Sequence, residues 1–412
     1  SGLVFILTIF TALVEIAAPL FVYLVASGFE NDPEKFSLTT LYTRIMFPYL
    51  MMMSLVGLYS GILNSLGRFA ASAAAPIALN ICMIGAIMLY ADADTHVAGQ
   101  AIAWGVAAGG VAQVAMLLIG AWRRGYILKL RLPRLTPAMK RLLALGAPGF
   151  ISAGAVQINL IVGTNIASQE PGAVSWLMNA DQLYQLPLSV IGIALGVVLL
   201  PMLSARVKAG DEKGAARALN RSLELAALLA LPAAAAFIIM GEAICDALFR
   251  GLAEEALSLF GVNRSAFNAE DVRQTGLALA VFGAGLPAFV WLKIFTPAFF
   301  AREDTKTPMH YALLSMAVNT ALSLALFPFF GFIAVAAATS VAAWLQVVLL
   351  AQRLYRQHLF RPSGELMGRF ARILLSVAAL SVFLLLVLPQ TEVLSRYLWG
   401  REWMVIVGLA GF

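Results

Sequence analysis

The chain has 412 residues, of which 61% are hydrophobic and only 12% are charged, with a mean hydropathy of +0.86 and a formal net charge of +6. A soluble domain is about half apolar and about a quarter charged, so this composition excludes an ordinary water-soluble globular fold. The positive charge does not indicate nucleic-acid binding, because the basic residues gather between long apolar segments.

These apolar segments are continuous and about as long as a helix that crosses a bilayer. They do not alternate with the period of two that a barrel strand requires, so the sequence predicts an all-α, polytopic membrane helical bundle. The first and last segments look incomplete, so both ends of the chain are expected to be truncated, and no cleavable signal peptide is expected. Twelve spans are predicted, at about 1–27, 40–64, 70–90, 97–122, 142–168, 176–203, 222–248, 273–300, 309–328, 332–352, 373–389 and 403–412.

The basic residues show a strong sidedness. Twenty of the 28 Lys and Arg residues fall in every second gap between spans, most of them in 123–141, 204–221 and 353–372. Short basic loops stay on the cytoplasmic side of a membrane. The sequence therefore places these gaps in the cytoplasm, and the intervening, more acidic gaps outside.

The chain also resembles itself at an offset of 239 residues. Pro48 matches Pro287 and Asn80 matches Asn319, each pair in a helix, polar reversal, helix pattern. Both copies start and end outside, so the repeat predicts two pseudo-symmetric lobes of parallel orientation, as in transporters that rock about a central site. The expected divisions are an N-terminal lobe at 1–122, a basic cytoplasmic linker at 123–141, a C-terminal lobe at 142–352 and accessory helices at 353–412, the last of them truncated.

Polar residues within spans are costly and usually face a cavity or a partner helix. The densest group flanks a short outer loop at 169–175 and is predicted to line a substrate cavity. Interhelical hydrogen bonding without a substrate is the alternative. The group consists of Gln157, Asn159, Asn165, Asn179, Asp181, Gln182 and Gln185.

Three lone charges lie at membrane depth. Glu15, Arg44 and Lys293 are interpreted as charge partners within the membrane, with substrate contact or snorkelling to the interface as alternatives. No P-loop, GxSxG, HExxH or Cys/His cluster occurs, so no catalytic site, metal or cofactor is predicted.

Four stretches carry a family resemblance: FPYLMMMSLVGLYSGILNSLGRF at 47–69, APIALNICMIG at 75–85, PGAVSWLMNADQLYQLPLSVIGIALGVVLLPMLS at 171–204 and FAREDTKTP at 300–308. Through them the chain resembles the MurJ (MviN) lipid II flippases, whose superfamily also holds MATE drug exporters and polysaccharide flippases. That family has fourteen helices. The resemblance implies that this chain supplies about twelve, from the third to the start of the fourteenth, so that 1–122 lacks the first two helices of its lobe.

The resemblance further implies a multi-pass protein of the bacterial inner membrane. Its expected activity is to flip the undecaprenyl-pyrophosphate-linked disaccharide peptide from the cytoplasmic to the outer leaflet by alternating access. Its expected partners are that precursor, membrane lipids and cell-wall synthesis proteins, and not nucleic acid. A cationic cavity is expected to hold the pyrophosphate, because guanidinium and phosphate form strong charge-assisted hydrogen bonds.

Two features depart from the family pattern. Gln182 stands where the family usually has Arg directly after Ala-Asp, which removes one expected cation from the cavity. The outer loop at 252–264 is longer than the family norm. Two alternatives therefore stay open: a related transporter of another cargo, such as a drug/cation antiporter or polysaccharide flippase, and a non-transporting cell-wall scaffold. The sequence does not indicate the driving ion, the oligomeric state or the conformational state.

Overall fold

The computed structural model describes residues 2–90, 93–123, 157–252, 267–360, 364–390 and 406. Within these ranges all regular structure is helical, which confirms the predicted all-α class. Contacts divide the chain into two compact units, 1–151 and 152–412. The predicted linker 123–141, the outer loop 252–264 and the segment after residue 390 lie almost entirely outside the described residues, so the predicted lobe boundaries stay a prediction.

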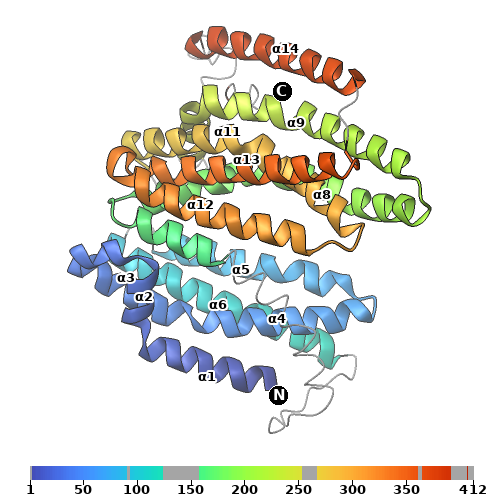
Figure 1. Ribbon diagram of the computed structural model, residues 1–412. Coiled ribbons are helices and arrows are strands. Elements are labelled where there is room, and N and C mark those ends of the chain that lie inside the picture. The colour runs from blue at the N-terminus through green and yellow to red at the C-terminus, as the bar shows by residue number, and fades with distance from the viewer. Residues whose placement is uncertain are drawn as a thin grey trace. The chain divides into compact units, whose positions relative to one another are not determined.

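The described part of unit 1 contains six α-helices, drawn from blue to cyan in Figure 1. The predicted span 1–27 is not one straight helix, because the chain breaks at Ala17 and its axis turns by 80°. Pro19 lies in the first turn after the break, where its missing N–H costs no hydrogen bond. The helices are α1 (Gly2–Ile16), α2 (Ala18–Val25), α3 (Pro33–Met46), α4 (Pro48–Ser65), α5 (Phe69–Leu89) and α6 (Thr95–Trp122), with a 3-10 turn at Ser27–Asn31.

Helix α6 is the packing partner of α3, α4 and α5. It approaches α5 closely at Gly109, where a Cβ atom would lie 3.0 Å from the Cα of Leu79. The Gln113 side chain, which is 2% exposed, donates from Nε2 to the backbone oxygen of Ala75 at 3.0 Å. Small residues and a buried amide thus join these helices, as is typical of membrane helix pairs.

Unit 2 is built around α11, which packs against α8, α9 and α13 (Figure 1). A Cβ atom at Gly276 of α11 would lie 2.6 Å from the Cα of Glu242 on α9, so glycine is required where these two backbones meet. Helix α14 packs on α9. The helices are a segment at 157–167, α8 (Ala173–Lys208), α9 (Glu212–Asp246), α11 (Ala269–Phe300), α12 (Lys306–Phe330), α13 (Ile333–Arg356) and α14 (Gly364–Val387), with short turns at Ala247–Leu252 and Leu388–Gln390.

Eight helices in the described part of the chain are long and apolar enough to cross a membrane, or nine if the bent pair α1 and α2 is one span. Each of them overlaps a predicted span. Helix α8 covers the predicted span 176–203. The predicted spans 142–168 and 403–412 are described only in part, so their full extent stays a prediction.

Polar side chains fasten the end of unit 2 that is predicted to face outside. The Trp176 indole donates from Nε1 to Asp271 Oδ1 at 2.8 Å. Asp271 also forms a reciprocal capping box with Asn268 at the start of α11. The Glu170 carboxylate accepts from the backbone N–H of Phe332 at 2.8 Å, at the start of α13. A carboxylate is favourable at each helix N-terminus, so these contacts tie together the starts of α8, α11 and α13.

The opposite, predicted cytoplasmic end carries a second set of contacts. Arg302, which follows α11, forms an ion pair with Glu212 at the start of α9. Asp304 accepts from the backbone N–H of Thr307 at 3.0 Å and so caps α12. Partial burial raises the pKa of the Asp304 carboxyl, but hydrogen bonds from Thr307 and the charge of Arg353 outweigh it, and the net pKa lies below the ordinary value.

Candidate functional site

The carboxylate of Asp181 is the centre of a polar group on α8. It is half-buried and accepts a hydrogen bond from the amide of Gln185, one turn along the same helix. The hydroxyl of Tyr184 is a second hydrogen-bond partner. Gln182 and Gln185 are exposed. Three of the predicted cavity residues, Asp181, Gln182 and Gln185, thus lie within two turns of α8, the first half-buried and the other two exposed.

Tyr184 is a residue of this group that sequence reasoning missed. Its ring lies 5.0 Å from that of Phe282 and 5.2 Å from that of Phe289, both on α11. The ring is buried while its hydroxyl reaches Asp181. Tyr184 thus fixes the carboxylate against the most buried helix of the unit. An aromatic residue in an apolar span gives no signal of this role, because most such residues only pack.

Asn159 belongs to a different polar cluster. Its Oδ1 accepts from Nδ2 of Asn319 on α12 at 2.9 Å. The hydroxyl of Thr339 on α13 lies 3.4 Å from Asn319 Oδ1 and also donates to the backbone oxygen of Val335 at 2.8 Å. Three helices thus meet through buried or half-buried polar groups. For Asn159 this geometry favours the alternative of interhelical hydrogen bonding.

The other predicted cavity residues lie apart from these two clusters. Asn179 is half-buried and donates to the Ser175 hydroxyl at 3.3 Å, on its own helix. Gln157 is exposed, and Asn165 is half-buried. Their assignment to a cavity stays a prediction.

In unit 1, Glu15 and Arg44 line one cavity of about 800 Å³. Nε of Arg44 donates to the backbone oxygen of Glu15 at 3.2 Å, so the two residues meet through the main chain and not through the predicted pairing of opposite charges. Pro48, Met52 and Trp104 are among the largely apolar side chains that complete the wall. A guanidinium and a carboxylate in an apolar wall form a polar site where a charged head group could be held.

Lys293 is exposed on α11, and its aliphatic stem lies beside Gly192 of α8. Within the described residues of unit 2 it forms no ion pair with Asp181 or any other carboxylate. An amine with no carboxylate partner among these described residues is available to an anionic ligand. In the part of the chain that the structure describes, no group of three or more His, Cys, Asp and Glu residues could hold a metal ion.

Comparisons with known proteins identify the family. The sequence model described as "Lipid II flippase MurJ" matches residues 1–401. A protein of Rhizobium tropici named "Probable lipid II flippase MurJ" is 44% identical over 378 residues, which are 91% of this chain and 68% of the relative. The chain belongs to the lipid II flippase MurJ family. A protein of Rickettsia prowazekii with the same name is 33% identical over 416 residues, which cover 100% of this chain and 78% of the relative.

Solved structures agree with this assignment at the level of the fold. A structure titled "Lipid II flippase MurJ, inward closed conformation" matches with a TM-score of 0.73 and 22% identity, over 99% of this chain and 79% of that one. A multidrug resistance MATE family transporter of the MOP superfamily, in an inward-facing conformation, matches with a TM-score of 0.63 and 14% identity, over 85% and 80% of the two chains. The predicted family and fold class are confirmed. The family and its apolar helices make the chain a multi-pass protein of the bacterial inner membrane.

Proposed function

We propose that this protein moves lipid II, the undecaprenyl-pyrophosphate-linked disaccharide peptide, from the cytoplasmic to the outer leaflet of the inner membrane. The observation that carries the proposal is the match of the MurJ family to residues 1–401, together with relatives that bear the name lipid II flippase. The drug-exporter alternative is less favoured, because the MATE transporter shares only 14% identity and supports the fold alone.

The mechanism is alternating access, in which two lobes open a polar path to one side of the membrane and then to the other. The head group of the cargo is too polar to cross the lipid core unaided, so exposed or half-buried polar residues within the spans would hold it. We assign this role to Asp181, Gln182 and Gln185 on α8 and to Lys293 on α11. Arg44 and Glu15 contribute the polar wall of the cavity in unit 1.

Lys293 supplies the positive charge that a pyrophosphate requires. Its ammonium is exposed and has no carboxylate partner within the described part of unit 2, so binding an anion would not require an existing ion pair to be broken. Transport requires binding and conformational change but makes or breaks no covalent bond, so we propose that the protein is not an enzyme. Cell-wall synthesis proteins are its proposed protein partners.

Complementation tests the proposal directly. The full-length gene is expressed in cells depleted of their own lipid II flippase, and growth and lipid II translocation are measured. We expect the wild type to restore both. Lys293→Gln should reduce translocation by about tenfold, which corresponds to the free energy of one hydrogen bond to a charged group. The matched control is Lys306→Gln, which removes the same charge at the start of α12 and leaves translocation unchanged.

Gln182→Arg is a second test of the same site. It restores the cation that the family usually carries beside Asp181, so we expect activity to be retained. Loss of translocation in this variant would contradict an anion-binding cavity. Failure of the wild type at normal membrane levels would favour another cargo or a scaffold role.

A further inference from the structure

An apolar chamber of about 290 Å³ lies between α9, α11, α13 and α14 in unit 2. Aromatic side chains form much of its wall, including Trp291, Trp344 and Phe370. The Trp291 ring contacts those of Trp344 and Phe370 edge-on, with centroids 5.4 Å and 5.9 Å apart. These ring contacts link α11, α13 and α14 and make the wall of the chamber apolar.

The chamber opens at the surface of the unit. Two of its lining residues, Val348 of α13 and Met367 of α14, are 56% and 62% exposed. Both helices are long and apolar enough to cross a membrane, and Met367 lies near the predicted cytoplasmic end of α14, so lipid can reach this surface from the inner leaflet. An acyl chain can therefore enter the chamber from the side.

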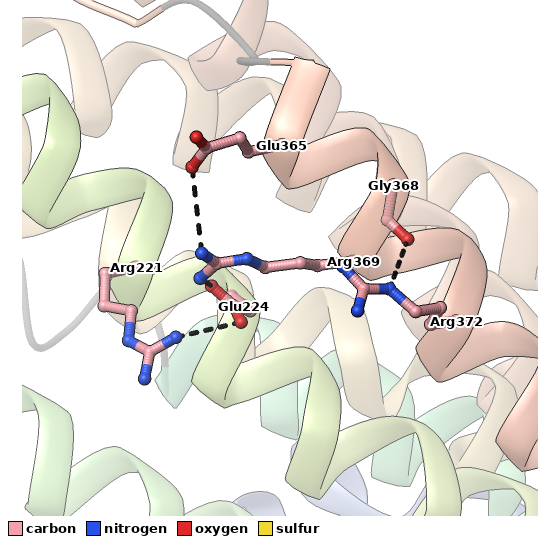
Figure 2. Close-up of polar contacts among 6 residues, drawn as sticks. All are labelled: Arg221, Glu224, Glu365, Gly368, Arg369 and Arg372. Atoms are coloured by element: carbon pink, nitrogen blue, oxygen red, sulfur yellow. Dashed lines mark hydrogen bonds and ion pairs between the residues drawn. The ribbon is translucent and has the colours of Figure 1, made fainter.

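A group of charged residues joins α9 to α14 (Figure 2). We call it the arginine seam, and it consists of Arg221, Glu224, Glu365, Arg369 and Arg372. Nη1 of Arg369 lies 2.8 Å from Glu224 Oε2, and its Nη2 lies 3.7 Å from Glu365 Oε2. Nη1 of Arg221 lies 2.9 Å from the other oxygen of Glu224. Arg369 is thus shared between two carboxylates, whereas Arg221 meets only one.

Arg372 is the third cation of the seam. Its Nε donates to the backbone oxygen of Gly368 at 3.3 Å, which turns its guanidinium back along α14 toward Arg369 (Figure 2). No carboxylate neutralises it among the described residues. Each guanidinium carries five N–H donors. Arg372, which is exposed, and Arg221, whose side chain is 58% exposed, therefore retain donors for an external anion.

The chamber and the seam occupy the same helical turns. Leu223 of the chamber precedes Glu224, and Met367 and Phe370 flank Arg369 in α14. On the predicted topology this is the cytoplasmic surface of the membrane, where the head groups of the inner leaflet lie. With three arginines and two carboxylates, the seam carries one net positive charge.

We propose that this seam binds an anionic glycerophospholipid. Its phosphate contacts Arg221 and Arg372, and one of its acyl chains enters the chamber. Ligand pockets measure about 300–1,000 Å³, so the chamber is suited to part of a chain and not to a whole lipid. Basic sites between membrane helices on the cytoplasmic side attract anionic head groups through their net charge. The bound lipid would lie between α9 and α14. This inference does not depend on the cargo proposed above.

Native mass spectrometry of the purified protein tests this inference. The protein is titrated with phosphatidylglycerol and, separately, with phosphatidylcholine of the same acyl chains. We expect tighter binding of phosphatidylglycerol. The double variant Arg221→Gln, Arg372→Gln should weaken it by about fivefold for each arginine while phosphatidylcholine binding is unchanged. Met367→Trp, which fills the mouth of the chamber, should weaken both lipids.

Two further variants keep the result interpretable. Arg356→Gln removes the same charge from the end of α13, outside the seam, and should leave both affinities unchanged. Arg372→Lys retains the charge and should retain most of the preference, which separates loss of charge from misfolding. Melting temperatures are recorded for every variant.

An unchanged lipid preference in the double variant would overturn the inference, and so would unchanged binding in Met367→Trp. Displacement of phosphatidylglycerol by undecaprenyl pyrophosphate would also overturn it, because the chamber would then belong to the cargo. Complementation is scored separately. Failed complementation with the lipid preference intact would count against the proposed cargo alone, and lost preference with intact complementation would count against the lipid site alone.

Discussion

The hydrogen bond between Asn159 and Asn319 provides a quantitative test of how unit 2 is held together. It joins residues 160 positions apart in the sequence, on the helix at 157–167 and on α12, at 2.9 Å. Asn319 is only 6% exposed, so water does not replace the partner that a substitution removes. We expect Asn319→Ala to destabilise the protein by about 1–2 kcal/mol, the cost of leaving a buried amide unpaired.

A double-mutant cycle isolates the pair. Hydrogen bonds between membrane helices average about 0.6 kcal/mol and reach about 1.7 kcal/mol. Because this bond is short and buried, the coupling between Asn159→Ala and Asn319→Ala should fall within that range. Thr339 contributes less, because its contact with Asn319 is 3.4 Å long and its hydroxyl keeps a bond to its own helix.

The assay is the free energy of unfolding in mixed micelles titrated with denaturing detergent, measured for the two single variants and the double variant. A control cycle pairs Asn159→Ala with Gln182→Ala. Gln182 is exposed on α8, whereas Asn159 bonds to Asn319 on α12, so the coupling should be within about 0.5 kcal/mol of zero. A coupling equal to that of the control would refute the reasoning. A fall in translocation with unchanged stability would instead support the predicted role of Asn159 in the substrate cavity.

Three further predictions concern stability. Asp271→Ala removes a capping box and the bond to Trp176, so it should cost about 1–2 kcal/mol and lower the melting temperature; a change below 0.3 kcal/mol would contradict the capping role. Asp304→Asn should destabilise most at neutral pH: the folded-state pKa of Asp304 is lowered, so its stabilisation is present above the ordinary Asp pKa and disappears as the pH falls through the folded value. Melting curves at several pH values test this, and a difference that grows on acidification would be the wrong sign. Gly276→Ala should reduce stability by about 2 kcal/mol or more, because its Cβ meets the backbone of α9, whereas Gly61→Ala, which meets nothing within 4 Å, should not.

Local sequence properties were sufficient for the fold class and for the spans that the structure describes in full, and four sequence stretches were sufficient for the family. The apolar length of a segment and the charge of the loops beside it are additive along the chain, and neither depends on which helices are neighbours. The spans predicted at 273–300 and 332–352 correspond to α11 and α13 in the structure. The span predicted at 1–27 corresponds to the bent pair α1 and α2, and its 80° bend at Ala17 is a feature that composition did not predict.

The sequence by itself determined which residues near 157–185 are polar and predicted that they lie at membrane depth, but only the tertiary structure decided what each one meets. Asn159 pairs with Asn319, Arg44 reaches the backbone of Glu15, and Tyr184 joins Asp181. A hydrogen-bond partner depends on the rotation of each helix about its axis and on how closely two backbones approach. Those quantities are decided by packing across the bundle, as at Gly276, and leave no periodic signal in the residues on either side.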